Sequence, residues 1–399
     1  MKLIDEKLKN QVLKSMITLI DENREELLNA NKKDLEVFNK EDQALYDRLV
    51  VDTSRIDGMI KAISEVKNQE DPVNTEISST ELDSGLKIIN RTAPFGSIMI
   101  IYESRPDVTI EAAVLAFKAN NKILLKGGKE AYNSNKVLVK FWHKALEENG
   151  LEKNWIKMLE LNREETQAFL KNPSEPIDLI VPRGGERLIQ FVKENATCAV
   201  LVSGRGNNFL YVAEDANWKK SLQVIINAKT DKISGCNALD KVLVDKKIPN
   251  YPLKLEELRK VLDSLDVNVL VDSEVKKTLT SSEVIENEET WYEEFLAMKI
   301  VIGAVENVDE AILKINKYSG GHSSGILTED SDKAAHFMEN IDSAAVYHNA
   351  STRFTDGGQM GVGAELAIST DKLHHRGPLG LKQLVTNKYY VYGDGHVRV

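Results

Sequence analysis

Two cysteines are the candidate nucleophiles of this 399-residue chain. Cys236 lies in the run Lys229-Thr-Asp-Lys-Ile-Ser-Gly-Cys-Asn-Ala238, and we expect a helix to begin near the end of this run. A thiol beside the N–H groups of a helix N-terminus has a lowered pKa, and covalent catalysis needs such an activated thiol. Packing as a small buried hydrophobe is the alternative for Cys236. Cys198 begins the apolar run Cys198-Ala-Val-Leu-Val202, where we expect core packing.

Glycine turns after predicted strands are a second candidate for chemistry. They are Lys126-Gly-Gly-Lys129 and Arg183-Gly-Gly-Glu186. Backbone amides at a strand-to-helix turn can bind the phosphates of a nucleotide. Neither turn has the GxGxxG spacing of the usual dinucleotide fingerprint, so an ordinary turn is the alternative for each.

Two arginines lie in polar segments. Arg353 belongs to Asn349-Ala-Ser-Thr-Arg-Phe-Thr-Asp-Gly-Gly358, which is either an exposed loop or a loop that binds a carboxylate or phosphate through the planar guanidinium. Arg105 lies in Tyr102-Glu-Ser-Arg-Pro-Asp107, just past a predicted buried strand. Ligands of open α/β sheets gather at that end of the strands, although an ordinary surface arginine fits the sequence equally well. The seven histidines show no metal-ligand spacing, so we expect no metal site.

The elements around these residues alternate between strand and helix. An apolar stripe of Leu13, Met16, Ile20 and Leu27 predicts helices in the charged first 70 residues. A hairpin is predicted over 81–91 and a last strand from Tyr389. The other predicted strands are 96–102, 122–126, 177–181, 198–202, 241–245, 268–272 and 299–305, and the predicted helices include 108–120, 130–149 and one from residue 186. This alternation indicates an α/β fold with a parallel sheet.

Composition excludes several classes of protein. A net charge of −10 and a pI near 5.4 argue against a nucleic-acid-binding protein, which needs a basic excess. No apolar run approaches the roughly 20 residues of a membrane-spanning helix. The first residues show no secretory signal, and two cysteines make no disulfide framework, so we expect a cytoplasmic protein.

Six segments, taken in order, resemble the gamma-glutamyl phosphate reductases (glutamate-5-semialdehyde dehydrogenases) of the aldehyde dehydrogenase superfamily. They are Ile101–Thr109, Leu124–Glu130, Val181–Gly185, Asn227–Thr230, Cys236–Ala238 and Asn349–Gln359. The resemblance implies two Rossmann-like three-layer α/β/α domains and a small β oligomerisation element. The expected division is a cofactor-binding domain at 1–77 and 94–228, a catalytic domain at 229–382, and the oligomerisation element at 78–93 and 383–399.

The resemblance also implies an activity. It is the NADPH-dependent reduction of L-glutamate 5-phosphate to L-glutamate 5-semialdehyde, with release of phosphate, in proline biosynthesis. Cys236 would be the nucleophile that forms a thioester, and Arg105 would bind the oxyanion and the phosphate. The implied substrate-binding residues are Lys229, Asn349, Ser351, Thr352, Arg353 and Phe354. The implied cofactor-binding residues are Lys126 at the adenine ribose, Gly127, Gly128, Arg183, Gly184, Gly185, and Glu294 at the nicotinamide ribose.

Some details depart from the family, and two rival functions remain. Asp107 stands where the family usually has asparagine, and the turn at 203–209 is atypical. A hydrolytic aldehyde dehydrogenase would need a general-base glutamate, but Leu201 occupies its place and no carboxylate occurs between Glu194 and Glu214. A non-catalytic nucleotide-binding relative would not need the cysteine and the polar loop. We expect a homo-oligomer, dimer or tetramer, and a glutamate 5-kinase is a further candidate partner.

Overall fold

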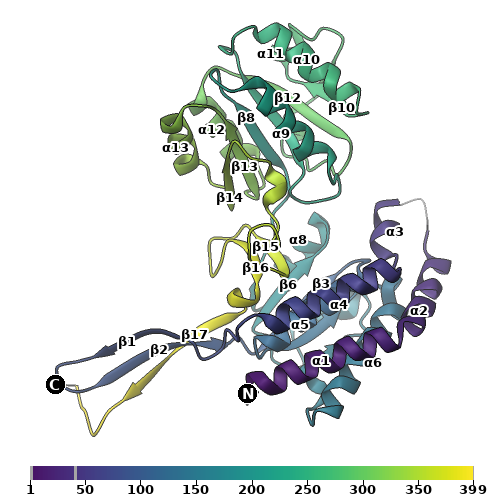
Figure 1. The fold of residues 1–399 in the computed structure, drawn as a ribbon, viewed down its shortest axis with the longest axis vertical. Coiled ribbons are helices and arrows are strands. Elements are labelled where there is room, and N and C mark those ends of the chain that lie inside the picture. Colours follow the sequence, from purple (N-terminus) through teal and green to yellow (C-terminus); the bar gives the residue numbers. More distant parts are fainter. Residues whose placement is uncertain (1–2, 40–42, 399) are drawn as a thin grey trace. The chain divides into compact units, whose positions relative to one another are not determined.

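The structure is a computed structural model that describes residues 3–39 and 43–398. The chain folds into two compact units (Figure 1). Unit 1 takes the described residues of Met1–Val202, Gly361–Ala367 and Leu379–Val399. Unit 2 takes Ser203–Met360 and Ile368–Pro378. Residues 203–228, which we expected with the cofactor-binding domain, therefore lie in unit 2. The reason is that β8 (Asn208–Val212) pairs with β9 (Leu239–Asp245) in the sheet of that unit.

Unit 1 is built on a parallel sheet with the strand order β5-β4-β3-β6-β7. Its strands are β3 (Ser97–Tyr102), β4 (Lys122–Lys126), β5 (Ile156–Met158), β6 (Leu179–Arg183) and β7 (Ala199–Val200). Its helices are α1 (Glu6–Glu22), α2 (Arg24–Val37), α3 (Gln43–Leu49), α4 (Thr53–Asn68), α5 (Pro106–Lys118), α6 (Tyr132–Glu148), α7 (Arg163–Lys171) and α8 (Glu186–Asn195). The predicted stripe of α1 and α2 is fully buried, which confirms it.

Both faces of this sheet are covered. Ile98 and Ile100 of β3 belong to the apolar core that α1, α4, α5 and α6 complete. Met99 and Ile101, which point to the opposite face because strand residues alternate, belong to a second core with α7 and α8. Two cores on the two faces of one sheet make a three-layer α/β/α unit, as we predicted.

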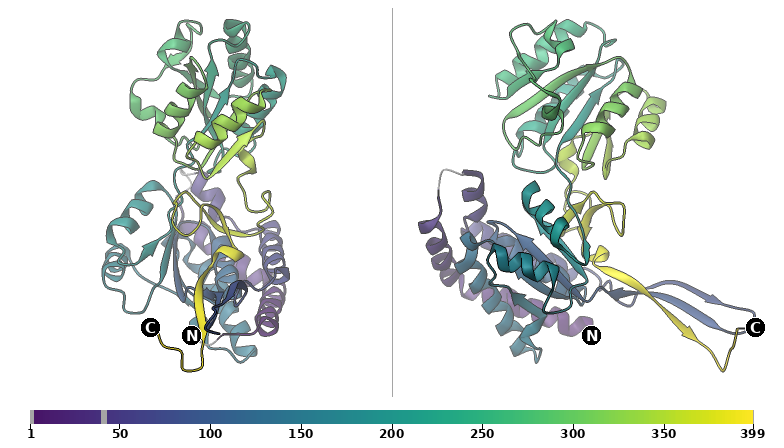
Figure 2. Two further views of the ribbon diagram at one scale, coloured as in Figure 1. Left: turned by 90° about the vertical axis from the view of Figure 1, so that its left-hand side faces the viewer. Right: turned by 180° about the vertical axis from the view of Figure 1, so that it is seen from behind.

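A separate antiparallel sheet of three strands completes unit 1. Its order is β1-β2-β17, formed by β1 (Glu76–Glu81), β2 (Lys87–Pro94) and β17 (Val385–Tyr392). Figure 2 shows these strands as a long ribbon apart from the five-stranded sheet. The predicted hairpin and terminal strand are thus confirmed, while their role in oligomerisation stays a prediction.

Unit 2 contains a seven-stranded parallel sheet with the order β11-β10-β12-β9-β8-β13-β14. The remaining strands are β10 (Asn268–Val271), β11 (Glu283–Val284), β12 (Lys299–Val305), β13 (Ser323–Leu327) and β14 (Ala345–His348). The helices are α9 (Trp218–Thr230), α10 (Tyr251–Asp263), α11 (Ser273–Lys276), α12 (Val308–Tyr318) and α13 (Ser331–Asn340). Alternate residues of β8 again enter two cores, Leu210 and Val212 on one face and Phe209 and Tyr211 on the other.

The remaining two strands pair with each other. A two-stranded sheet is formed by β15 (Glu365–Ser369) and β16 (Gly377–Gly380). Within residues 3–39 and 43–398, no helix is long and apolar enough to cross a membrane. The same described residues hold no cluster of three His, Cys, Asp or Glu side chains suited to a metal ion.

Candidate active site

Cys236 lies on the turn between α9 and β9, just before the strand begins. The prediction of a helix near Ala238 is wrong, because Leu239–Asp245 is a fully buried strand in the middle of the sheet. The local sequence after Cys236 resembles a helix start, but tertiary packing of the apolar run that follows decides the outcome. A helix N-terminus after Cys236 therefore does not activate the thiol.

The main chain of Cys236 is held by the segment that the sequence marked as atypical. The Nδ2 of Asn208 donates to Cys236 O at 2.8 Å and to Ala238 O at 2.7 Å. A Cβ atom at Gly206 would lie 2.0 Å from Cys236 O, so only glycine allows this close approach. Sequence reasoning missed Asn208, although an amide directly before an apolar strand was a usable signal.

The polar loop predicted to bind substrate meets the Cys236 turn through Asn237. The Nδ2 of Asn237 donates to Arg353 O at 3.2 Å and to Thr355 O at 2.9 Å. In return, the buried hydroxyl of Thr352 donates to Asn237 O at 2.7 Å. The hydroxyl of Ser351, also buried, accepts from Arg353 N at 3.3 Å and shapes the loop. Thr352 and Ser351 thus build the loop, and the fold brings it against the residue next to Cys236.

A cavity of about 280 Å³ adjoins this junction. Its lining residues are Asn227, Asp231, Arg353, Phe354, Asp356 and Gln359. The Nε of Arg353 pairs with Asp231 Oδ2 at 3.0 Å, and its guanidinium lies close to Gly235, the residue before Cys236. The cavity therefore offers one cation and two carboxylates beside the Cys236 turn.

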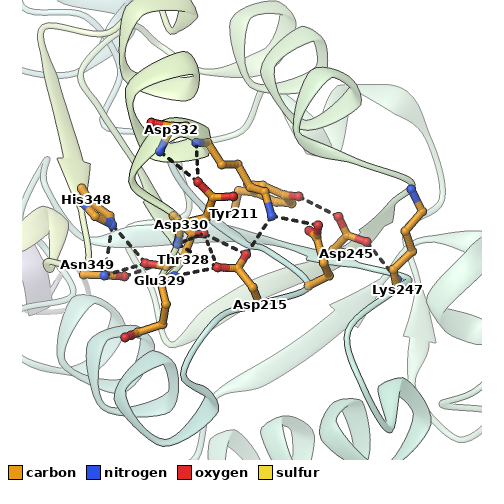
Figure 3. Close-up of polar contacts among 12 residues, drawn as sticks. Tyr211, Asp215, Asp245, Lys247, Thr328, Glu329, Asp330, Asp332, His348 and Asn349 are labelled. Carbon is orange, nitrogen blue, oxygen red and sulfur yellow. Dashed lines mark hydrogen bonds and ion pairs between the residues drawn. The ribbon is translucent and has the colours of Figure 1, made fainter.

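Asn349 serves the loop in a different way from the one we expected. Its backbone has a positive φ of 53°. Its side-chain Nδ2 donates to Thr328 O at 2.7 Å, and its Oδ1 accepts from Thr328 N at 3.1 Å. Figure 3 shows this pair beside Asp215, which accepts the Thr328 hydroxyl at 2.8 Å. Burial acts to raise the pKa of Asp215, but Lys333 and Thr328 outweigh it and lower the pKa to about 2. Asn349 thus anchors the loop to an ionised network.

Lys229 does not line the cavity. It is fully buried, and its Nζ pairs with Asp240 Oδ1 at 3.0 Å. Burial lowers the pKa of Lys229 even though Asp240 opposes the shift. The positive charge of Lys229 suggested a substrate ligand, but this charge is paired with a buried carboxylate that the local sequence does not show.

In unit 1, the other expected residues gather at one edge of the sheet. Tyr102, the last residue of β3, pairs with Arg183 at the end of β6, and Ile101 pairs with Lys126 at the end of β4. Because all three strands are parallel, Arg183, Lys126 and the Arg105 loop after β3 meet at the carboxyl edge. Ligand sites of open α/β sheets lie at this edge.

The turn after β4 fits an anionic nucleotide. A Cβ atom at Gly127 would lie 2.4 Å from Asn135 Nδ2 and 3.2 Å from the Tyr102 ring, so this turn is tightly packed. Lys126 is half-buried beside it, and burial lowers its pKa, opposed by Glu130. A cation beside such a backbone turn suits a phosphate or a ribose hydroxyl.

The turn after β6 is less open to phosphate. Gly185 caps α8, and its N–H donates to Glu103 Oε2 at 3.3 Å. A Cβ atom at Gly184 would lie 2.5 Å from the same carboxylate oxygen. Because a carboxylate already occupies this helix N-terminus, Arg183 is the group of this turn that suits an anion.

Glu294 belongs to unit 2 and precedes β12, as Cys236 precedes β9. Since β9 and β12 are neighbouring parallel strands, both segments approach the sheet at its amino edge. The fold thus brings the proposed nicotinamide-ribose ligand and the proposed nucleophile to the same edge of one sheet.

Comparisons with known proteins show the family to which the chain belongs. The model of the "Aldehyde dehydrogenase family" matches residues 1–294 and 276–365. The gamma-glutamyl phosphate reductase of Thermotoga maritima is 44% identical over 394 residues, which are 98% of this chain and 94% of that protein. The chain belongs to the gamma-glutamyl phosphate reductases. A reductase of Clostridium botulinum is 42% identical over 395 residues, with 98% and 94% of the two chains covered.

Solved structures give the same result for the fold. The crystal structure of the Thermotoga maritima gamma-glutamyl phosphate reductase has a TM-score of 0.94 at 42% identity, covering 99% of this chain and 95% of that one. An acetylating aldehyde dehydrogenase from Geobacillus thermoglucosidasius has a TM-score of 0.69 at 18% identity, covering 99% and 94%. The first confirms the predicted family and fold, and the second shows the aldehyde dehydrogenase fold alone.

Asp107, the departure from the usual asparagine of the gamma-glutamyl phosphate reductases, pairs with Arg105. The Arg105 Nη2 lies 2.9 Å from Asp107 Oδ2. Burial acts to raise the pKa of Asp107, but the Arg105 guanidinium outweighs it and lowers the pKa. The guanidinium expected to bind phosphate is therefore held by a carboxylate of its own chain.

Replacing this carboxylate should strengthen phosphate binding. Asp107→Asn keeps an acceptor for Val108 N, which now donates at 3.1 Å, but removes the negative charge beside Arg105. Because a partly exposed ion pair of this kind is worth at most about 1 kcal/mol, we expect the KM for phosphate in the reverse reaction, the oxidation of glutamate semialdehyde, to fall about two- to fivefold. Steady-state kinetics at constant ionic strength measures it. An unchanged or higher KM would mean that Arg105 does not bind phosphate.

Proposed function

We propose that this chain reduces L-glutamate 5-phosphate to L-glutamate 5-semialdehyde and releases phosphate, with NADPH as the reductant. The product serves proline biosynthesis in the cytoplasm. The observation that carries the proposal is the hydrogen-bonded junction of the Cys236 turn with the Arg353 loop. It occurs in a chain that is 44% identical to a gamma-glutamyl phosphate reductase over nearly its full length.

The reaction uses Cys236 as a covalent catalyst. Its thiolate attacks the acyl carbon of the mixed anhydride, the C–O bond to phosphate breaks, and a thioester forms. When bound, the nicotinamide cofactor supplies the hydride that reduces this thioester. The C–S bond to Cys236 then breaks, which releases the aldehyde and returns the thiolate.

The cavity beside the Cys236 turn suits the amino-acid end of the substrate. That end carries an α-carboxylate and an α-ammonium group. Arg353 would bind the carboxylate, while Asp231 and Asp356 supply the negative charge that an ammonium needs. The arrangement favours a zwitterionic substrate over a simple aliphatic aldehyde.

The proposed cofactor ligands are the residues that the resemblance implies. Lys126 and the Gly127–Gly128 turn support the adenosine part, Arg183 and the Gly184–Gly185 turn lie beside it, and Glu294 binds the nicotinamide ribose. We further propose a homo-oligomer, dimer or tetramer, built through the ribbon of β1, β2 and β17. A glutamate 5-kinase that hands over the labile acyl phosphate is a proposed partner.

Substituting the cavity arginine should damage substrate use selectively. In Arg353→Lys the charge stays, but the planar fork that grips a carboxylate at two points is lost. We expect the KM for glutamate semialdehyde to rise about tenfold, the effect of losing one charge-assisted hydrogen bond, with the NADPH Kd nearly unchanged. Arg259→Lys, on α10 outside the cavity, is the matched control. If the two variants had equal kinetics, Arg353 would be an ordinary surface residue that does not bind the substrate.

The direct test of the function runs the reaction backwards. Glutamate semialdehyde should reduce NADP⁺ when phosphate is present, and NAD⁺ should be the poorer substrate. A non-catalytic relative would give no turnover at all, and a better rate with NAD⁺ would overturn the choice of NADPH.

A further inference from the structure

Two consecutive charged residues lie in the central strand β9 of unit 2. Asp240 and Lys241 are 2% and 0% exposed. Successive residues of a strand point to opposite faces, so the two groups enter the protein on different sides of the sheet. Burying a carboxylate and an ammonium ion is costly unless their contacts compensate, so the contacts they make indicate what they do.

Asp240 connects two segments of the proposed site. Its Oδ1 pairs with Lys229 Nζ at 3.0 Å, at the end of α9, and this ion pair closes the base of the turn that carries Cys236. Its Oδ2 accepts from Phe295 N at 3.0 Å. The Cys236 turn and the residue after Glu294 are therefore tied to one carboxylate.

Lys241 holds the other side of the same short segment. Its Nζ donates to Glu293 O at 2.7 Å and to Asn207 Oδ1 at 2.8 Å, and it lies 3.9 Å from the centre of the Phe295 ring. Burial lowers the pKa of Lys241 to about 7, against the opposing charge of Asp240. The backbone oxygen before Glu294 and the backbone N–H after it are thus each fixed by a buried side chain of β9.

We propose that Asp240 and Lys241 are positioning residues that fix the backbone on both sides of Glu294 and so hold its carboxylate ready for the cofactor. Asp240 also links this segment to the turn of the nucleophile. The proposal rests on the proposed function, in which Glu294 binds the nicotinamide ribose. Neither the motif around Cys236 nor the polar loop positions Glu294, and the proposal gives this role to the two buried side chains of β9.

The test compares cofactor binding among four variants by titrating NADPH fluorescence. Lys241→Met keeps the length and removes the donors, and we expect the NADPH Kd to rise about tenfold, because Glu293 O and Asn207 Oδ1 lose their donor. Lys241→Gln keeps one donor and should recover part of this loss. Glu294→Gln should weaken NADPH binding by at least as much. Lys118→Met removes another fully buried lysine, paired with Glu6 in unit 1, and should leave the Kd unchanged.

A purely structural role would give a different pattern. Thermal unfolding of each variant identifies a temperature at which all the variants are folded. The NADPH Kd and the KM for semialdehyde are both measured at that temperature. Positioning predicts a change in NADPH Kd with little change in the semialdehyde KM. A normal Kd in Lys241→Met, while Glu294→Gln binds weakly, would overturn the proposal. A normal Kd in Glu294→Gln would also overturn it, but phosphate-dependent turnover of the unaltered enzyme would leave the proposed function intact.

Discussion

Replacing Cys236 with serine is expected to lower kcat by at least about 1,000-fold, since a serine hydroxyl is hardly ionised at neutral pH and forms no thioester. The NADPH Kd should stay nearly unchanged, because the turn is held through backbone atoms that the substitution keeps. Stopped assays with and without phosphate measure kcat. Titration of NADPH fluorescence measures the NADPH Kd.

The second cysteine supplies the matched control. Cys198 is half-buried beside the apolar core of unit 1, and burial raises the pKa of its thiol. Cys198→Ser should therefore keep most of the activity. Retention of more than a few per cent activity in Cys236→Ser would show that another group is the nucleophile.

Without phosphate, oxidation of glutamate semialdehyde is expected to stop after one NADPH per site. A hydrolytic enzyme releases its acyl group with a water that a glutamate activates, and such a base must lie within hydrogen-bond reach. Leu201, which the sequence predicts at the place of that glutamate, is 4% exposed and packs in the apolar core of unit 1. Asp231 and Asp356, which line the cavity, already accept hydrogen bonds from Arg353 and from backbone N–H groups.

The measurement is a burst of NADPH absorbance at known enzyme concentration, followed by addition of phosphate. Phosphate is itself a nucleophilic anion and needs positioning more than deprotonation. It should restart turnover at once. Continued turnover before the addition, with free glutamate as the product, would place this chain among the hydrolytic aldehyde dehydrogenases.

Much of the fold was predictable because local signals and tertiary packing agree. The predicted strand at 122–126 is β4 to the residue, since an apolar run stands between Asn121 and the Gly127–Gly128 turn. The alternation of strands and helices indicated the parallel sheets. The short strands β13 and β14 were not predicted, because the Ser323-Ser324-Gly325 start of β13 has no apolar pattern and is buried only by its neighbours.

The sequence motifs of the candidate site were predictable, but the buried contacts behind them were less so. Cys236 and Arg353 stood out by residue type, and the fold joins their segments. The helix expected after Cys236 is a strand, because seven buried residues pack between β8 and β12. Lys229 was misplaced for a related reason: a lysine in a motif shows its charge but not the buried Asp240 that pairs with it. Asn208 was missed because its side chain carries no charge, although it stands at the start of an apolar strand.

The central claim, a glutamyl thioester on Cys236, is tested most directly by locating the acyl group after the burst without phosphate. The enzyme is quenched in acid, which keeps the α-amino group protonated and unable to attack the thioester, and its peptides are analysed by mass spectrometry. We predict one glutamyl group per site, on the peptide that contains Cys236, removable by neutral hydroxylamine. A glutamyl group on another residue, or a full burst with no acylated peptide, would contradict the account.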